Sequence, residues 1–238
     1  MKKHLRHIIY LISALFNYNR KSKVLYYHDV GICYTKMGTP LILIKSQLNK
    51  VKHHEYEFVN QITKDSNQVM VCFDDGWAGI YDSKDFFIKE NIFPIVFLVI
   101  DFIGKEGYLT KEKIKELQKA GFSFGCHTWS HRDLTKVPQE ELYHEVVDSK
   151  KALEELLGNT VDSICFPKGR YSKDIYELCL SAGYERIFTS TIGCYRDNLD
   201  EKLICRNLIQ DTPTLYIWSV LHGNPLVLKK HSKKQQFV

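Results

Sequence analysis

The chain has 238 residues, of which 44% are hydrophobic and 26% are charged. These proportions are ordinary for a soluble domain and exclude a disordered chain, a fibrous repeat and a polytopic membrane protein. The formal net charge is only +5, so the composition predicts no nucleic-acid partner. Much of the basic excess lies at the two ends, which suits contact with anionic lipid or polymer; solvated tails are the alternative, and the pattern alone favours them.

The first segment is basic and apolar. Lys2 and Lys3 precede an apolar run at residues 8–16, which is too short to span a bilayer. We predict a helix over residues 4–18, in an N-terminal unit of residues 1–22 that packs on the body or lies on a membrane surface. Because no small-residue cleavage site follows, we favour a cytoplasmic protein at the inner membrane face, with a signal anchor or export as the alternative.

Beyond residue 22, short apolar runs alternate with helical patterns. Strands are predicted at residues 24–28, 69–74, 94–100, 122–127, 163–167, 186–189 and 203–209. Helices are predicted at residues 41–53, 78–90, 110–120, 138–157, 173–182 and 213–221. Strands separated by helices imply parallel pairing, so the pattern predicts a barrel-like α/β fold in a single domain, residues 23–225, followed by a basic tail, residues 226–238.

The seven cysteines form no C-x-x-C pair. An odd count without that spacing favours neither a zinc knuckle nor a disulfide framework. Cys72, Cys126, Cys165 and Cys205 fall in the apolar runs, where a thiol serves as a small hydrophobe, and this usage favours a reducing compartment.

Three polar clusters follow predicted strands, and in parallel α/β folds the chemistry gathers at the carboxyl ends of the strands. The first cluster is Asp74, Asp75 and Gly76. Two adjacent carboxylates after an apolar run are costly unless a cation or a proton balances them, and Gly76 lets the chain turn so that both approach one point. The alternative is an ordinary Asp-Gly turn.

The second cluster holds His127 and His131. Histidines four residues apart suit one metal ion, and imidazoles with a carboxylate are the expected ligands of zinc and its divalent neighbours. Two surface histidines explain the spacing equally well when it stands alone. Combined with Asp74 and Asp75 on another strand end, the pair predicts a metal site with open coordination positions.

The third cluster is a short turn that contains Pro167, Lys168 and Gly169. Its backbone N–H groups would face a ligand at the end of the preceding strand. An ordinary strand-to-helix loop is the alternative, and the stretch alone favours that alternative.

Together these motifs resemble a known family. Phe-Asp-Asp-Gly at residues 73–76, His-Thr-x-x-His at residues 127–131 and Phe-Pro-x-Gly at residues 166–169 are similar to motifs of the polysaccharide deacetylases, the carbohydrate esterase group that includes chitin and peptidoglycan deacetylases. Tyr-Tyr-His-Asp-Val at residues 26–30 resembles the opening strand of shorter bacterial members. The resemblance runs from about residue 24 to residue 222 and implies a distorted (β/α)₇ barrel.

The resemblance also implies roles for the first two clusters. Asp75, His127 and His131 would bind a divalent metal, with zinc expected and cobalt or another divalent ion as alternatives. Asp74 would be the general base. The division agrees with the chemistry, because a metal acidifies water and polarises an acetyl carbonyl, while a neighbouring carboxylate takes the proton.

The third cluster departs from the family pattern. The backbone N–H of Lys168, between Pro167 and Gly169, would hold the oxyanion of the tetrahedral intermediate. Lys168 stands where members commonly carry tyrosine, so one wall of the site becomes cationic. Arg206 matches an arginine found late in shorter members and would steady the base or hold substrate, and the ring of Trp77 suits a sugar face.

The general acid that protonates the leaving amine is less well defined than the base. His222, which follows a predicted helix, and His28, which ends a predicted strand, are the candidates. The resulting hypothesis is a metal-dependent hydrolase that removes N-acetyl groups from amino sugars of a polysaccharide or a glycolipid-linked intermediate. Alternatives are a catalytically weak or inactive sugar-binding barrel, and a hydrolase of another non-peptide C–N bond.

Overall fold

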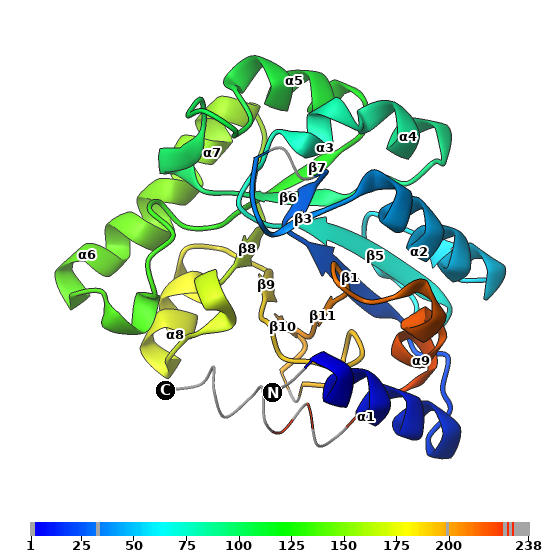
Figure 1. Ribbon diagram of the computed structural model, residues 1–238. Helices are drawn as coiled ribbons and strands as arrows, with labels where there is room; N and C mark the ends of the chain where they lie inside the picture. The colour runs from blue at the N-terminus through cyan, green and yellow to red at the C-terminus, as the bar shows by residue number, and fades with distance from the viewer. Residues whose placement is uncertain (1–2, 32–33, 199, 226–227, 229, 231–238) are drawn as a thin grey trace.

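The computed structural model describes residues 3–31, 34–198, 200–225, 228 and 230. Within them, a parallel sheet of nine strands curves into an open barrel with helices around its outside (Figure 1). The strands of the chain are β1 (Lys23–Tyr27), β2 (Asp29–Val30), β3 (Gly38–Thr39), β4 (Glu57–Phe58), β5 (Gln68–Phe73), β6 (Ile95–Leu98), β7 (Ser123–Cys126), β8 (Ser163–Cys165), β9 (Arg186–Phe188), β10 (Leu203–Ile204) and β11 (Asn207–Leu208).

The strand order in the main sheet is β10-β9-β8-β7-β6-β5-β1-β11, with β4 also paired to β5, and β2 and β3 pair with each other. The strands predicted between residues 24 and 189 are therefore confirmed as β1, β5, β6, β7, β8 and β9. With the helices outside, this arrangement confirms the predicted distorted (β/α)₇ barrel.

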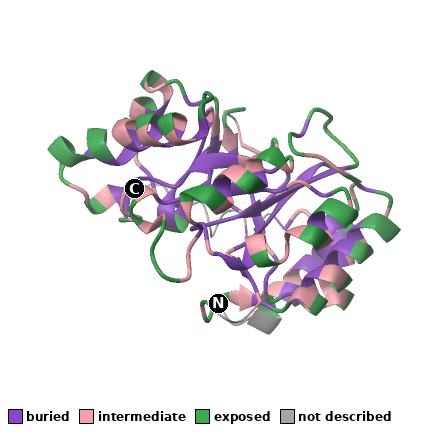
Figure 2. Ribbon diagram, turned by 90° about the horizontal axis from the view of Figure 1, so that it is seen from above, coloured by how far each residue is buried: buried purple, intermediate pink, exposed green. Residues whose placement is uncertain are grey.

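Continuous apolar runs form these strands because both faces of the sheet are covered. In β5 all six residues are buried, but they divide between two cores. Val71 and Phe73 pack in the cluster between the sheet and the helices, whereas Met70 and Cys72 pack with Phe97 inside the barrel. Figure 2 shows the result, a buried sheet within helices whose outer faces are exposed.

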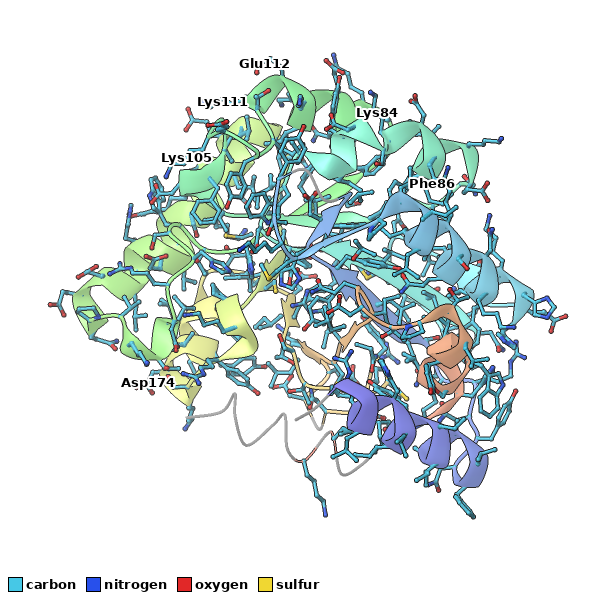
Figure 3. The ribbon with its side chains drawn as sticks, viewed as in Figure 1. Lys84, Phe86, Lys105, Lys111, Glu112 and Asp174 are labelled. Atoms are coloured by element: carbon cyan, nitrogen blue, oxygen red, sulfur yellow. The ribbon has the colours of Figure 1, made fainter. Side chains whose placement is uncertain are left out.

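The helices are α1 (Lys3–Phe16), α2 (Leu41–His53), α3 (Gly79–Asp82), α4 (Lys84–Lys89), α5 (Lys111–Lys119), α6 (Gln139–Tyr143), α7 (Ser149–Leu157), α8 (Lys173–Ser181) and α9 (Ile217–His222). Many of their charged side chains point outward, as the exposed Lys111, Glu112 and Asp174 show in Figure 3. None of the helices in the described part of the chain combines the length and the apolar character that a membrane span requires.

One strand prediction is wrong. Residues 203–209 form no single strand, because β10 pairs with β9 at one edge of the sheet while β11 pairs with β1 at the other. The chain crosses between the two edges at Cys205 and Arg206. Among the described residues β10 and β11 do not pair with each other, so the sheet is not closed there. The buried guanidinium of Arg206 marks this crossing, which we call the seam.

Two helix predictions are also corrected. The helix predicted over residues 78–90 breaks into α3 and α4 at Ser83, whose φ of −107° is not helical. The helix predicted over residues 138–157 contains a π-helical turn, His144–Asp148, between α6 and α7. π-Turns inside helices often accompany functional sites, and this one carries a buried carboxylate.

The helices α1 and α9 pack against each other. α1 confirms the predicted N-terminal helix, although it ends at Phe16, two residues earlier than predicted. Residues 226–227, 229 and 231–238 lie outside the described residues, so the predicted tail and the division into units stay predictions. No disulfide joins the described cysteines, and each of them is buried, in keeping with a role as small hydrophobes.

The N-cap residue of α5, Thr110, allows a test of how much a helix cap contributes to stability. Thr110 Oγ1 accepts a hydrogen bond from the N–H of Lys113 at 3.3 Å. Thr110→Ala removes this acceptor and should lower the free energy of unfolding by about 1 kcal/mol in urea denaturation. Thr160→Ala, at an exposed loop threonine, should leave it nearly unchanged; equal losses in both variants would contradict the cap.

Candidate metal and catalytic site

Three side chains from two strand ends converge on one point. Asp75 lies two residues beyond β5, His127 directly follows β7, and His131 lies in the loop after it. The Nε2 atoms of His127 and His131 lie 3.4 and 3.2 Å from Asp75 Oδ1. Together the three residues offer ligand atoms that all lie within 4.8 Å of one another. The structure therefore brings together the predicted ligand set.

This arrangement suits a cation. Asp75 Oδ1 is buried, and no residue that the structure describes donates a hydrogen bond to it. Burial raises the pKa of Asp75, but the imidazoles of His127 and His131 outweigh that effect and leave the pKa below its usual range. Burial and His127 lower the pKa of His131 to about 4, so this imidazole is neutral and its nitrogen can ligate a metal at pH 7. One carboxylate and two imidazoles form a typical catalytic zinc donor set.

Neighbouring groups orient two of these ligands. His127 Nδ1 lies 2.7 Å from the carbonyl oxygen of Cys165. Because a carbonyl only accepts, Nδ1 carries a proton, and Nε2 is the ring nitrogen that faces Asp75 and could ligate a cation. Trp77 Nε1 donates to Asp75 Oδ2 at 3.1 Å, and the indole stacks on Tyr108. Trp77 thus fixes the carboxylate of Asp75, a contact that the sequence analysis missed.

The loops that carry the site have strained backbones. Asp75, Thr128, His131 and Lys168 all have positive φ, at 72°, 68°, 62° and 58°. Such conformations cost of order 1–3 kcal/mol each in non-glycine residues and concentrate at functional sites, where the surrounding structure imposes them. Gly76 follows Asp75 with φ 79°, and a Cβ atom there would meet Leu98 Cδ2 at 2.7 Å. The turn after Asp75 therefore requires glycine.

A buried carboxylate from the π-helical turn holds the histidine loop. Glu145 is 0% exposed and accepts hydrogen bonds from the backbone N–H groups of Trp129 and Ser130 at 3.1 and 3.0 Å. It also accepts from Ser130 Oγ and from Nε and Nη2 of Arg132. Sequence analysis missed Glu145 because a glutamate on an amphipathic helix looks like a surface residue. Its position close to the buried Leu142 was the only feature of the sequence that indicated a buried carboxylate.

The predicted base forms a buried ion pair. Nη1 and Nη2 of Arg206 donate to Oδ1 and Oδ2 of Asp74 at 2.7 and 3.0 Å. Arg206 is 1% exposed, and its Nε donates to the carbonyl oxygen of Thr189 at 2.8 Å. Burial raises the pKa of Asp74, but the guanidinium outweighs that effect and leaves the pKa below its usual range. The carboxylate is therefore ionised at neutral pH.

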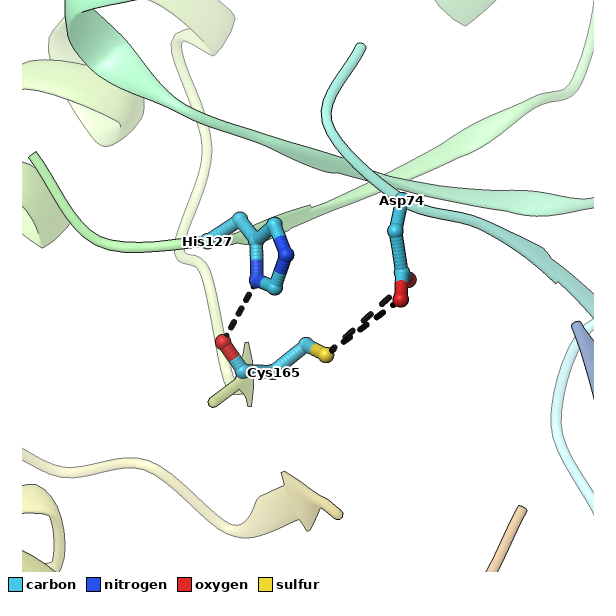
Figure 4. A group of neighbouring side chains, drawn as sticks. All are labelled: Asp74, His127 and Cys165. Carbon is cyan, nitrogen blue, oxygen red and sulfur yellow. Dashed lines mark hydrogen bonds between the residues drawn. The ribbon is translucent and has the colours of Figure 1, made fainter. Parts of the chain in front are cut away.

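Cys165 forms the wall behind Asp74 and His127 (Figure 4). Its Sγ lies 3.9 Å from each carboxylate oxygen of Asp74, so these three residues form a second group of potential metal ligands. Both oxygens of Asp74 already accept from Arg206, however, and burial raises the pKa of the Cys165 thiol. A neutral thiol and an occupied carboxylate make this group a wall of the site rather than a second metal centre.

The predicted oxyanion turn lies beside the metal ligands. Pro167–Gly169 forms a tight turn after β8, and the exposed Lys168 side chain is close enough to lower the pKa of His131. Gly169 has φ 68°, and a Cβ atom there would meet Ser190 at 2.8 Å, so this position also requires glycine. Arg170 donates to Asp133 at 2.9 Å, which ties the turn to the histidine loop.

The two candidate acids lie in different places. His28 is half-buried, and its Nδ1 pairs with Gln210 Oε1 at 2.7 Å. It lies close enough to Asp74 and Asp75 to lower the pKa of both carboxyl groups. His222 is buried elsewhere, with Nδ1 3.0 Å from the carbonyl oxygen of Asn19 and its ring stacked on Tyr18. The structure does not bring His222 into the site.

Comparison with known proteins places this geometry in a family. A family model described as polysaccharide deacetylase matches residues 61–187, more than half of the chain. The chain belongs to the polysaccharide deacetylase family. The resemblance drawn from the three motifs is thereby confirmed.

Curated relatives of this deacetylase-family chain include YxkH of Bacillus subtilis, 29% identical over 126 residues, which are 52% of this chain and 45% of YxkH. The peptidoglycan-N-acetylglucosamine deacetylase PgdA of Listeria monocytogenes is 28% identical over 119 residues, 48% of this chain and 24% of PgdA. The chain thus spans about half the length of YxkH and about a quarter of PgdA.

Solved structures show the same fold. The Streptococcus pyogenes deacetylase PplD, in complex with acetate, superposes with a TM-score of 0.76 at 21% identity, covering 84% of this chain and 98% of PplD. IcaB from Ammonifex degensii superposes with a TM-score of 0.73 at 22% identity, covering 85% of this chain and 98% of IcaB. At 21% and 22% sequence identity, this similarity shows a shared barrel fold.

Removal of one ligand tests the metal site. His131→Ala deletes one imidazole nitrogen and should reduce the metal bound per chain after dialysis against zinc, as measured by elemental analysis. His53→Ala removes an exposed histidine on α2 and should keep the metal content of the wild type. Unchanged stoichiometry in His131→Ala would contradict the ligand set.

Removal of the Glu145 charge tests how the histidine loop is held. Glu145→Gln keeps the size of the side chain but directs an amide donor toward groups that also donate, so the loop should shift and metal affinity should fall about 10-fold or more. Glu141→Gln is the matched control, because Glu141 also pairs with Arg132 but is solvent-exposed. Titration with a chromophoric zinc chelator gives both affinities; wild-type affinity in Glu145→Gln would show that the loop holds its shape without this carboxylate.

Proposed function

We propose that this chain is a metal-dependent N-deacetylase that hydrolyses the N-acetyl group of an amino sugar. The observation that supports it most is the placement of an ionised carboxylate, Asp74, next to a buried site with an Asp75, His127 and His131 donor set. A divalent cation bound there supplies Lewis-acid polarisation of the acetyl carbonyl and acidifies a water molecule. We expect zinc, with cobalt or another divalent ion as alternatives.

The side chains then have separate tasks. Asp75, His127 and His131 hold the cation, while Asp74 takes the proton of the attacking water. Arg206 keeps Asp74 ionised and fixes its orientation through two hydrogen bonds, and a carboxylate retains lone pairs for a water after both are made.

The backbone N–H of Lys168, after Pro167, holds the oxyanion as charge develops on the acetyl oxygen. His28 is the remaining candidate for the acid that protonates the leaving amine, because His222 lies outside the site. The indole of Trp77, partly exposed above Asp75, borders the place where a sugar ring would lie.

The substrate class follows from the family and from the charge of the site. Family membership and the peptidoglycan-N-acetylglucosamine deacetylases among the relatives support an amino-sugar polysaccharide or a glycolipid-linked intermediate. The exposed ammonium of Lys168 at the rim favours a substrate with negative charge near the acetamido group. A glycolipid-linked substrate would place the enzyme at a membrane, and we propose the inner membrane face as its location.

Asp74→Asn tests the proposal directly. Asparagine cannot take the proton of water, so acetate release from an N-acetylglucosamine oligomer should fall about 10²–10⁴-fold or below detection, while the bound metal stays in place. The measurement pairs an acetate assay with elemental analysis of the same sample. Asp101→Asn, at an exposed aspartate, is the matched control and should retain activity.

The same assay separates the alternatives. Acetate release that is unchanged in Asp74→Asn would mean that the base is misassigned. A wild-type chain that binds the oligomer and the metal but releases no acetate would instead be a sugar-binding barrel. A panel of small cyclic amides, run with the same preparation, would reveal a hydrolase of another C–N bond.

A further inference from the structure

The N-terminal helix α1 has an inner face that ties it to the barrel. His7, Tyr10 and Ala14 are at most 4% exposed. The ring of His7 stacks on Tyr216, and the hydroxyl of Tyr10 donates to Asn207 Oδ1 at 2.8 Å. These contacts hold α1 against α9 and against the seam of the barrel.

The opposite face of α1 is an exposed apolar stripe. Its members recur at the three- and four-residue spacing of one helix face, and about half or more of each is exposed: Leu5 49%, Ile8 48%, Ile12 50%, Leu15 64% and Phe16 79%. We call this set the outer stripe. Leu11 extends it toward Leu215, which is 80% exposed, across a hollow of about 420 Å³ that Lys50 and Trp218 also line. A contiguous apolar surface on a charged domain marks an interaction site.

The segment that carries the outer stripe has basic residues and no acidic ones. The sequence holds no acidic residue before Asp29 and none after Asp211. Its basic residues in these two end segments are Lys2, Lys3, Arg6, Arg20, Lys21, Lys23, Lys229, Lys230, Lys233 and Lys234. α1 and α9 belong to these segments and lie side by side at one side of the barrel (Figure 1). The apolar helix face thus belongs to a segment that has basic residues and no acidic ones. Within that segment Arg20 and Lys21 pair with Glu55 and Asp197, and Lys23 is buried.

We propose that the outer stripe of α1 is a docking surface for the interfacial region of a membrane rich in anionic lipid. α1 has 14 residues and is about 21 Å long at a rise of about 1.5 Å per residue, so it can lie in the interface but cannot cross the bilayer. Apolar side chains with flanking lysine and arginine and no acidic group are the composition of such interfacial helices.

Other occupants fit the surface less well. A second copy of the chain would bring two acid-free, positively charged regions together, which costs Coulomb energy. Residues 231–238 contain only Phe237 and Val238 as apolar residues, too few to cover five large side chains. The surface is separate from the catalytic residues, so this proposal does not depend on the proposed activity.

Co-sedimentation of the full chain with vesicles tests it. The probes are vesicles of phosphatidylcholine alone and of an equal mixture of phosphatidylcholine and phosphatidylglycerol. We expect at least about 10-fold stronger partition onto the anionic vesicles, decreasing as salt is added. The double variant Ile12→Gln/Phe16→Gln should lose at least about 10-fold of that partition, because two exposed apolar side chains no longer enter the interface.

Ile42→Gln is the matched control, because Ile42 is 75% exposed but lies on α2, outside the acid-free segments. Its partition should equal that of the wild type, and thermal melts should show all variants folded, since the changed positions are exposed. Equal partition of the wild type and the double variant would overturn the proposal. So would a dimer, seen by light scattering without lipid, that only the double variant dissociates. Acetate release is not a readout here, so either proposal can fail without the other.

Discussion

The ion pair between Asp74 and Arg206 connects the chemistry of the site to the closure of the barrel. Arg206 lies at the seam, where the chain crosses from β10 to β11, and it spans the gap to the end of β5. Removal of one member of a buried pair typically costs about 3–5 kcal/mol, because the other charge stays behind without a partner. The base of the proposed reaction is therefore also a structural residue. A variant of either partner has to be examined for folding before its activity is interpreted.

This pair also influences the protonation states of the carboxylates in the site. With Asp74 held ionised by Arg206, and with Asp75 facing two imidazoles, the carboxylates keep different roles although they are adjacent in sequence. Asp74 is neutralised by the guanidinium of Arg206, whereas Asp75 is the carboxylate that we propose for the cation. The strained turn at Asp75 makes this separation geometric, because a left-handed residue followed by Gly76 directs neighbouring side chains to different partners. Strain of this kind persists only where packing and hydrogen bonds oppose it, which is what Trp77 provides for Asp75.

Most of the barrel could be predicted from the sequence because its strands are buried on both faces. A run such as residues 69–73 is apolar throughout, and the helix at residues 41–53 has the predicted bounds. The convergence of the candidate ligands was also predictable, since Asp75 and His131 lie close behind such runs. The family resemblance, rather than spacing, supplied the distinction between Asp74 as base and Asp75 as ligand.

The errors have a common physical cause. Whether residues 203–209 form one strand depends on which sheet edge each half meets, and local pattern does not record that choice. Glu145 and His222 are opposite errors. In the sequence Glu145 looks like a surface residue, yet its carboxylate accepts hydrogen bonds from five protein donors. His222 looks like a site residue in the sequence, yet it is buried outside the site. Burial and partners, which only the assembled fold defines, decide both cases.

The seam relates the two surfaces that we propose. Asn207 follows Arg206 directly, accepts from Tyr10 of α1, and donates to the carbonyl oxygens of Val24 and Gly193. One residue pair therefore anchors the base on the inside of the barrel and the N-terminal helix on its outside. An open barrel leaves strand edges unpaired, and the inner face of α1 reaches one of these edges through the hydrogen bond from Tyr10 to Asn207 in β11. Such a helix would ordinarily turn polar side chains outward, so the needs of the fold do not explain the exposed Ile12 and Phe16, whereas the proposed membrane contact does.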